Sequence, residues 1–259
     1  MNLQYWFIVS NDSLVTDAAT QSPILTITQI QPIKEFLKHQ HFLGNINNTD
    51  IYCAELTHIE AMPTPLSTLP LRKALDIISD EWYITAVKAH GIINWDKNHQ
   101  FCGRCGNPTK HDSHLFERIC IACGQVFYPR ISPSVVGLIY RGNQILMARS
   151  PHFTKGAYGL IAGFVEPGES AEAALHREIA EEVSISIKQP HYFGSQAWPF
   201  PDSLMLAYIA EYSHGDIVID GKEIECADWY DFDKLPGRPS TRSSLSSKLI
   251  DYFIATQRN

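Results

Sequence analysis

Residues 163–185 read GFVEPGESAEAALHREIAEEVSI, and most of this stretch predicts an acidic helix. Ser170 is a suitable N-cap residue, and Glu172 falls in the first turn, where the helix dipole favours a negative charge. The run 171–183 is rich in good helix formers and contains neither glycine nor proline. We therefore expect a helix over residues 171–183.

The expected helix carries three glutamates on one face. Glu178, Glu181 and Glu182 are spaced i, i+3 and i+4, so a helix brings their carboxylates together. Like charges at this spacing repel each other, and a hard divalent cation that prefers oxygen ligands would offset the repulsion. The spacing alone leaves two interpretations open, a metal site and a solvated acidic face.

The whole stretch resembles the Nudix box, Gly-x5-Glu-x7-Arg-Glu-U-x-Glu-Glu-x-Gly-U, in which U is an apolar residue. Gly163, Glu169 and Arg177 complete the fixed positions, and a chance match to six positions is expected about once in 10^7 starting points at ~6% usage. The single departure is Ser184, which replaces the glycine at the end of the helix, a position that is often left-handed. The resemblance favours the metal site and implies hydrolysis of a nucleoside diphosphate linked to another group.

The composition is that of an ordinary globular protein, with 259 residues, 44% apolar and 19% charged. This length allows one large or two modest domains. The net charge of -7 argues against a broad basic surface for nucleic acids, while a local basic groove stays compatible with it. No apolar run approaches the ~18–20 residues that span a bilayer. Because the first basic residue is Lys34, we recognise no secretion signal and expect a cytoplasmic protein.

The first of three expected regions is an N-terminal domain over residues 1–98. The runs 5–9 and 51–56 are strand-like, and apolar residues at helical spacing predict a helix over about 80–95. No residue pattern in this region indicates chemistry. We expect a small mixed domain that serves as a partner, dimerisation or substrate-gripping module.

The second expected region, residues 99–127, contains two Cys-x2-Cys knuckles. Their cysteines are Cys102, Cys105, Cys120 and Cys123. Two knuckles at this separation predict a zinc ribbon, in which four thiolates close a tetrahedral structural site around one Zn2+. His111 and His114 lie between the knuckles and could compete as ligands, although surface positions on the hairpin are favoured. A disulfide pair is the other alternative, and a cytoplasmic location disfavours it. The two remaining cysteines, Cys53 and Cys226, are expected to be small buried apolar residues.

The third expected region, residues 128–259, mixes strands with helices. The runs 135–140 and 144–148 read as a hairpin around a turn at 141–143. Further strands are expected at 158–161, 204–212 and 228–232. A closing helix is expected at 245–255. This order predicts an α/β (α+β) fold, and the resemblance implies a Nudix α/β/α sandwich preceded by the zinc ribbon and the small N-terminal domain.

A zinc ribbon followed by a Nudix box resembles the NADH pyrophosphatase branch of the Nudix hydrolases. A second motif agrees, because residues 195–203 read SQAWPFPDS where this branch carries SQPWPFPxS, and only Ala197 departs. Together the motifs extend the resemblance over about residues 70–255. The resemblance implies cleavage of NAD(H) to AMP and nicotinamide mononucleotide with Mg2+ or Mn2+, and a homodimer. A rigid loop that caps the core is the alternative for the second motif.

The resemblance also implies which residues act. The implied Mg2+ or Mn2+ ligands are the main-chain carbonyl of Ala162 and the carboxylates of Glu178, Glu181, Glu182 and Glu223. Glu181 is either a third ligand from the helix or the catalytic base, and Glu225 competes with Glu223. We expect Arg177 to anchor the box loop by pairing with Glu169.

Substrate contacts are implied around the second motif. The residues are Tyr128, Phe164, Gln196, Ala197, Trp198, Pro199, Phe200, Pro201, Asp202 and Ser203. Aromatic and proline faces suit stacking on a nicotinamide or adenine ring. A place in the core is the alternative for Tyr128 and Phe164.

Two further functions remain open at this point. The same chemistry would remove an NAD cap from RNA, helped by the ribbon and a local basic patch of Arg104, Lys110, Arg118 and Arg130. A nucleotide- or RNA-binding module without turnover is the alternative from another class. The intact set of Glu178, Glu181 and Glu182 argues against a module without activity.

Overall fold

The computed structural model describes residues 3–57, 62–112, 115–238 and 244–258. The chain forms two compact units, Met1–Arg130 and Ile131–Asn259, and each is described by itself. In the described parts of the chain no helix is both long enough and apolar enough to cross a membrane.

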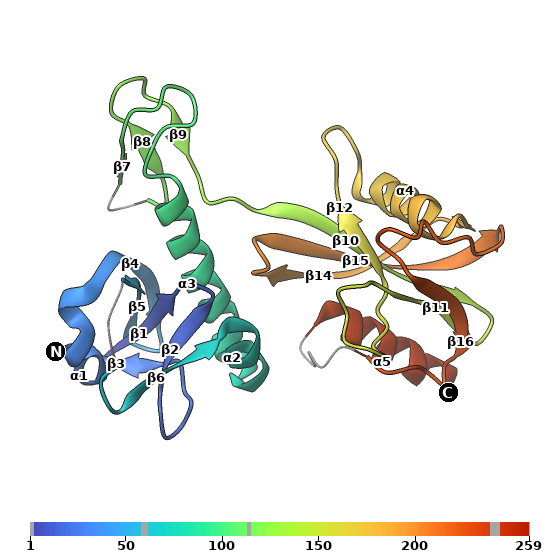
Figure 1. The fold of residues 1–259 in the computed structure, drawn as a ribbon, viewed down its shortest axis with the longest axis horizontal. Helices are drawn as coiled ribbons and strands as arrows, with labels where there is room; N and C mark the ends of the chain where they lie inside the picture. Colours follow the sequence, from blue (N-terminus) through green and yellow to red (C-terminus); the bar gives the residue numbers. More distant parts are fainter. Residues whose placement is uncertain (1–2, 58–61, 113–114, 239–243, 259) are drawn as a thin grey trace. The chain divides into compact units, whose positions relative to one another are not determined.

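The first unit contains a six-stranded sheet in the order β4-β5-β1-β2-β6, with β3 paired to β1 (Figure 1). Its strands are β1 (Gln4–Ser10), β2 (Ser13–Asp17), β3 (Leu25–Thr26), β4 (Leu37–Ile46), β5 (Thr49–Leu56) and β6 (Leu66–Pro70). Its helices are α1 (Ile27–Ile30), η1 (Gln31–Phe36), α2 (Leu71–Ile77) and α3 (Asp80–Asn98). The expected strands at 5–9 and 51–56 are confirmed as β1 and β5, and they pair in parallel. The expected helix is confirmed as α3, which packs against β1, β4 and β5.

A three-stranded sheet follows α3 in the same unit. It consists of β7 (Thr109–His111), β8 (Arg118–Cys120) and β9 (Val126–Phe127). The two cysteine knuckles repeat one hydrogen-bond pattern, in which Gly106 N donates to the Cys102 carbonyl and Gly124 N to the Cys120 carbonyl. Both glycines are left-handed, with φ of 74° and 72°, which L side chains adopt poorly.

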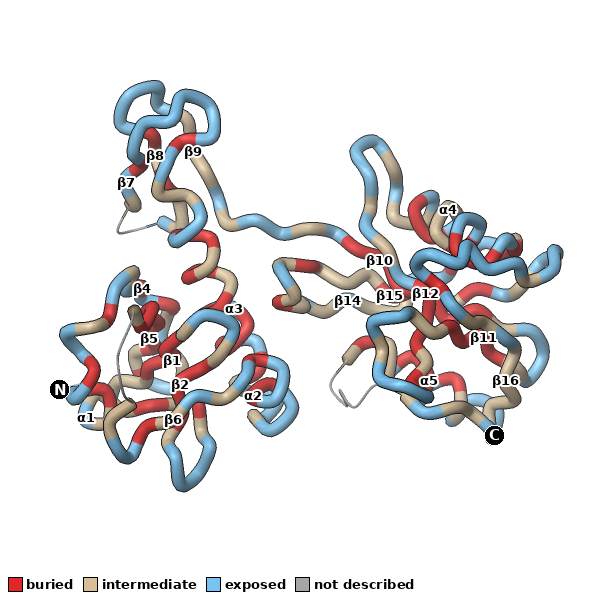
Figure 2. Tube along the Cα trace, viewed as in Figure 1, coloured by how far each residue is buried: buried red, intermediate tan, exposed pale blue. Residues whose placement is uncertain are grey.

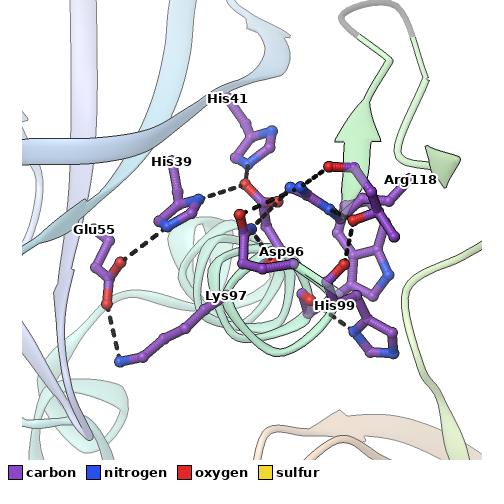
Figure 3. A network of polar contacts seen from close by, with 10 residues as sticks. His39, His41, Glu55, Asp96, Lys97, His99 and Arg118 are labelled. Carbon is purple, nitrogen blue, oxygen red and sulfur yellow. Dashed lines mark hydrogen bonds and ion pairs between the residues drawn. The ribbon is translucent and has the colours of Figure 1, made fainter. Parts of the chain in front are cut away.

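A buried polar network joins this small sheet to α3 and β4 (Figure 3). Arg118 of β8 forms an ion pair with Asp96 of α3, whose other oxygen contacts His41 Nε2 at 2.8 Å and His39 Nδ1 at 2.9 Å. Burial raises the pKa of Asp96, but the hydrogen bond from His41 and the charge of Arg118 outweigh it and hold this pKa well below its usual range. The inclusion of Arg118 in an exposed basic patch is therefore wrong, because this side chain is buried and paired.

The second unit contains a seven-stranded sheet in the order β13-β15-β10-β11-β16, with β12 paired to β10 and β14 to β15 (Figure 1). Its strands are β10 (Ser132–Arg141), β11 (Gln144–Arg149), β12 (Ile161–Phe164), β13 (Ser186–Ile187), β14 (His191–Trp198), β15 (Ser203–His214) and β16 (Cys226–Asp231). The central pair β10 and β15 is parallel, and the remaining pairs are antiparallel. The expected strand at 204–212 is confirmed as β15.

Two helices cover opposite faces of this sheet. Alternate residues of β10 point to different cores: Val135 packs with α4 (Ala171–Val183), and Val136 packs with α5 (Leu245–Gln257). The buried residues accordingly follow β10 through the middle of the unit (Figure 2). The layers are helix, sheet and helix, so the expected α/β/α sandwich is confirmed.

Three local expectations need correction. The strand expected at 158–161 lies instead at Ile161–Phe164, because the start of the box pairs with β10 while Gly159 makes an isolated bridge to Ala148. The hairpin turn comprises only residues 142–143, since Arg141 already pairs with Gln144. Cys53 is buried as expected, but Cys226 is only half-buried.

Candidate active site

The four knuckle cysteines form a compact thiol cluster. All four Sγ atoms lie within 4.8 Å of one another. Cys105 Sγ is 3.5 Å from Cys120 Sγ and 3.5 Å from Cys123 Sγ. A tetrahedron of thiolates at ~2.3 Å from Zn2+ has edges of about 3.8 Å, so the cluster fits one zinc ion. Hydrogen bonds, above all from the Asn107 backbone, lower the pKa of Cys105 to about 6 and favour the thiolate that binds metal.

His111 is not one of these ligands. Its ring packs edge-on against His41 at 4.5 Å between centroids and lies 6.2 Å from the ring of Trp95. It is half-buried in the first unit, so its expected place on the hairpin surface is wrong. His114 lies outside the described residues.

The box helix is built as the sequence predicts. Ser170 Oγ accepts a hydrogen bond from Ala173 N at 3.1 Å, which caps the first turn of α4. The helix ends at Ser184, whose φ of 59° and ψ of 22° are left-handed. The departure from the box motif thus falls on a residue with the backbone conformation that glycine adopts most easily.

Gly163 allows strand β12 to approach the acidic face of α4. A Cβ atom at this position would lie 2.0 Å from Glu178 Cδ, a distance that real atoms do not adopt. Ser134 Oγ of β10 donates to the Gly163 carbonyl at 2.8 Å and holds the strand in place. The Ala162 carbonyl, the expected main-chain ligand, belongs to the neighbouring residue in β12, which pairs with Val136.

Glu182 is the most unusual carboxylate of the unit. Its side chain is buried, with the residue 6% exposed, and among the described residues its Oε2 has no hydrogen-bond partner. Burial first, and then the charges of Glu178 and Glu223, raise the pKa of Glu182 to about 8. Burial also raises the pKa of Glu178, against the effect of Arg177. Buried oxygens in a field of like charge suit a divalent cation, so these residues fit the metal that the box motif implies.

Arg177 organises the box loop. Its Nε donates to Glu169 Oε1 at 2.7 Å and its Nη2 to Glu169 Oε2 at 3.0 Å, which confirms the expected pair as a two-point contact. The same guanidinium donates to Glu178 Oε1 at 2.9 Å and to Glu181 Oε2 at 3.1 Å, contacts that the sequence did not reveal. Within the described residues, the four cysteines are the only group whose ligand atoms all lie within 4.8 Å of one another. The oxygen atoms of the α4 carboxylates do not all lie this close together.

The fourth acidic position favours Glu223 over Glu225. Glu225 forms an ion pair with Arg149, and Arg149 also donates to the Phe153 carbonyl at 3.1 Å. The charge of Glu223, in contrast, acts on both Glu178 and Glu182. The contacts and charges therefore support Glu223 better than Glu225 as the fourth acidic residue of the site.

The second motif lies on a hairpin and not in a loop. Residues 195–198 belong to β14 and pair with β15, and residues 199–202 form the turn. The rings of Trp198 and Phe200 meet edge to face at 5.2 Å between centroids and 64°. Of the ten expected contact residues only Pro199 and Ser203 are buried. Phe164 is 52% and Tyr128 66% exposed, which rules out the alternative place in the core for both, and Tyr128 belongs to the first unit.

Asp220 is a residue of this acidic group that was not predicted from the sequence. This residue stands in the run Asp220-Gly221-Lys222-Glu223, and an Asp-Gly pair is a turn signal that could have pointed to it. Hydrogen bonds from the backbone, first that of Glu223, lower the pKa of Asp220. Its charge also contributes to the raised pKa of Glu182.

Three family models match consecutive parts of the chain. They are an NADH pyrophosphatase-like rudimentary NUDIX domain over residues 3–95, an NADH pyrophosphatase zinc ribbon domain over 97–128, and a NUDIX domain over 130–253. The order of these models along the chain is the order that the motifs indicate.

Similar proteins carry one common description. The NAD-capped RNA hydrolase NudC of Chromobacterium violaceum is 46% identical over 215 residues, which cover 83% of this chain and 80% of that protein. The protein of the same description from Pseudomonas putida strain KT2440 is 40% identical, covering 86% of this chain and 82% of that protein. A crystal structure of a NUDIX hydrolase from Nitrosomonas europaea matches 62% of this chain and 93% of that chain, with a TM-score of 0.53 and 18% identity. At that identity the structural match supports the fold alone.

Proposed function

Because this chain belongs to the NADH pyrophosphatase branch of the Nudix hydrolases, we propose that it hydrolyses the pyrophosphate bond of NAD(H). The products are AMP and nicotinamide mononucleotide. The same reaction on an NAD-capped RNA releases nicotinamide mononucleotide and leaves a 5'-phosphate on the RNA. Both substrates present the same bond to the site, and the relatives' description as NAD-capped RNA hydrolases supports the second one.

One observation carries this proposal: among the described residues Glu182 Oε2 is buried without a hydrogen-bond partner, and the charges of Glu178 and Glu223 act on this carboxylate. A carboxylate in this setting is destabilised unless a cation offsets its charge. We assign the ligands as Glu178, Glu182, Glu223 and the Ala162 carbonyl. Mg2+ and Mn2+ both suit such oxygen donors, and Mn2+ is used below because its binding is readily measured.

When bound, such cations neutralise the pyrophosphate and lower the pKa of the attacking water. Water adds to one phosphorus while the bridging P–O bond breaks, and the proton of the water needs an acceptor. We assign this proton to Glu181, whose side chain is 60% exposed and so can meet water, with a third-ligand role as the alternative. Arg177 holds Glu178 and Glu181 in place through its two hydrogen bonds.

The β14–β15 hairpin supplies the recognition of the dinucleotide. Trp198 and Phe200 form an edge-to-face pair whose flat surfaces suit a nicotinamide or adenine ring. Gln196, Asp202 and Ser203 offer polar groups on the same hairpin, and Phe164 offers an exposed ring from β12. A substrate contact by Tyr128 stays a prediction of the resemblance alone.

Product analysis tests the proposed reaction. Purified protein is incubated with NADH, NAD+, NADPH and an NAD-capped RNA, each with Mg2+ and with Mn2+ at a fixed salt concentration. The proposal expects nicotinamide mononucleotide, in its reduced form from NADH and NADPH. An equal amount of AMP should form from NADH and NAD+, and of adenosine 2',5'-bisphosphate from NADPH. Absence of turnover with every pyrophosphate and metal would support the binding module instead.

Fewer exposed basic residues could contact an RNA substrate than the sequence indicated. With Arg118 buried, the basic group on the ribbon reduces to Arg104, Lys110 and Arg130, all exposed. If they contact RNA phosphates, replacing all three with Gln lowers kcat/KM for capped RNA and leaves that for NADH unchanged. An equal loss on both substrates would argue against an RNA contact.

We also propose a homodimer in the cytoplasm. Phe101, Ile121 and Tyr128 are each more than 60% exposed, and large exposed apolar residues mark an interaction surface where they form one patch. Sedimentation equilibrium tests the dimer, and a monomer at all concentrations would refute it. No disulfide joins any of the six cysteines, all of which lie in the described part of the chain, as is usual in a reducing compartment.

A further inference from the structure

The loop between β15 and β16 is fastened to the end of α4 by its backbone. Val218 N donates to the Val183 carbonyl at 3.1 Å, and Asp220 N donates to the Glu182 carbonyl at 3.1 Å. The last turn of a helix leaves its carbonyl groups without intrahelical partners, and this loop supplies two of the missing donors. One of these two hydrogen bonds therefore attaches the loop to the main chain of Glu182, the residue that supplies the buried carboxylate.

The Asp220 side chain then shapes the segment that carries Glu223. Its Oδ2 accepts a hydrogen bond from Glu223 N at 2.9 Å, and its Oδ1 accepts one from Ile224 N at 2.9 Å. Because each oxygen already accepts a backbone hydrogen bond, the carboxylate is engaged in the loop itself. Ile224, only 7% exposed, packs into the core beneath α4 and holds the far side of the turn.

The segment is also fixed where it leaves the loop. Glu225 N donates to the Arg149 carbonyl at 3.0 Å, and the side chains of these two residues form an ion pair. Glu223 thus lies between two anchored points, one on α4 through Asp220 and one on β11 through Arg149. Asp220 connects the two acidic positions directly, through its amide to the Glu182 carbonyl and through its carboxylate to the Glu223 amide.

We propose that Asp220 is a positioning residue that holds Glu223 against the carboxylates of α4. The inference rests on the proposed function, in which Glu223 is a metal ligand. Outer residues that orient metal ligands typically contribute about 10–100-fold to metal affinity. Asp220→Ala should therefore weaken divalent metal binding by about tenfold or more, although the ligands themselves remain.

Calorimetric titration with Mn2+ tests this role without substrate. The full chain is used with its zinc retained, as wild type, Asp220→Ala, Asp220→Asn and Asp216→Ala. Asp216→Ala is the matched control, since it removes the same charge from an exposed position of the same loop and should bind within twofold of wild type. Asp220→Asn also removes the charge but keeps one acceptor oxygen, so it should bind more tightly than Asp220→Ala.

A double-mutant cycle shows whether Asp220 acts through Glu223. Glu223→Gln alone should weaken Mn2+ binding, and adding Asp220→Ala to it should cause little further loss. Independent, additive losses would overturn the positioning role, and so would an Asp220→Ala protein that binds like Asp216→Ala. If Glu223→Gln binds Mn2+ like wild type, the ligand assignment of the proposed function fails first. Should Asp220→Ala not fold, Asp220→Asn takes its place in the cycle, and wild-type affinity there would equally refute the role.

Discussion

At the scale of the residue, Gly163 shows why the box motif begins with a glycine. The residue faces Glu178 across the gap between β12 and α4, and no side chain fits between them. A methyl group placed there would displace the Glu178 carboxylate or push the strand away from the helix. The glycine thus serves the geometry of the carboxylates, because its own φ is not in the left-handed region.

We predict that Gly163→Ala lowers kcat/KM for NADH about 10–100-fold, the usual loss when the surroundings that orient a metal ligand are disturbed. Gly91→Ala is the matched control, since it makes the same change in α3 at a position with open space around it. That control should keep wild-type activity. Full activity of Gly163→Ala would contradict the close approach of β12 to Glu178.

Contacts of single residues could be predicted from the sequence where both partners belong to one short motif. They could not be predicted where the partners are far apart in the sequence. The pairing of Arg177 with Glu169 was predicted because both belong to one contiguous motif and are only 8 residues apart. The burial of Arg118 was not, because its partner Asp96 is 22 residues away on another element. Asp220 was missed for a similar reason, since its link to Glu182 depends on how the β15–β16 loop folds back.

At the scale of the element, the end of α4 carries a local strain. Ser184 is left-handed, and this conformation costs an L residue other than glycine or asparagine about 1–2 kcal/mol. Glycine removes that cost but loses about 0.5–1 kcal/mol through the greater freedom of its unfolded chain. We predict that Ser184→Gly raises the free energy of unfolding of the second unit by about 0.5–1 kcal/mol.

Urea unfolding measures this change, and Ser184→Ala is its control. Alanine keeps the Cβ atom that makes the left-handed conformation costly, so no stabilisation should follow. Equal stability of the glycine and alanine variants would show that the C-terminal residue of α4 is not strained. Activity should stay unchanged, because Ser184 follows the acidic face and does not belong to it.

The ribbon is the element that depends most on a metal. Its sheet has three strands of two or three residues, too few to hold a core, so the thiolate site should supply most of its folding free energy. We predict that Cys105→Ser or a strong chelator releases zinc and lowers the melting temperature of the first unit. Metal analysis and circular dichroism measure both effects. A protein that loses zinc and melts as before would refute a structural role.

Element boundaries were predictable where the pattern was periodic. The helix α3 followed from apolar spacing, and α4 followed from its N-cap residue and its good helix formers. The closing helix expected at 245–255 is confirmed as α5. The strand β12 was placed too early because its sequence, Ile161–Phe164, overlaps the glycine-led start of the box and looks like a loop. Its strand character comes from pairing with β10, which is tertiary and leaves no local periodicity. The same holds for residues 195–198, which lie in β14.

At the scale of the whole molecule, one polar network links the ribbon to the N-terminal sheet within the first compact unit. Asp96 has a folded pKa below its unfolded value of about 3.8, so the folded state binds fewer protons in acid. Its contribution to stability is complete above the unfolded pKa and is lost as the pH falls toward the folded pKa. Asp96→Asn removes this contribution at every pH and leaves Arg118 buried without its partner.

We predict that the stability difference between wild type and Asp96→Asn is largest at pH 7. It should shrink by about 1 kcal/mol between pH 5 and pH 3, since each pH unit contributes up to ~1.4 kcal/mol once only the unfolded carboxyl titrates. Urea unfolding of both proteins at each pH gives the difference, and acid effects on zinc cancel because both retain the ribbon. A difference that is constant with pH would refute the lowered pKa.

For the whole molecule, we expect the α4 carboxylates to hold the metal that promotes pyrophosphate cleavage. Glu182→Gln keeps the shape of the buried side chain, and Glu211→Gln is the control on an exposed strand position. The decisive measurement is the amount of AMP and nicotinamide mononucleotide released from NADH by the two variants with Mn2+, beside their melting curves. We expect Glu182→Gln to fold like wild type and to lose at least about 100-fold in turnover, as when a central catalytic charge is removed. Wild-type product release by Glu182→Gln with a normal melting curve would contradict the account.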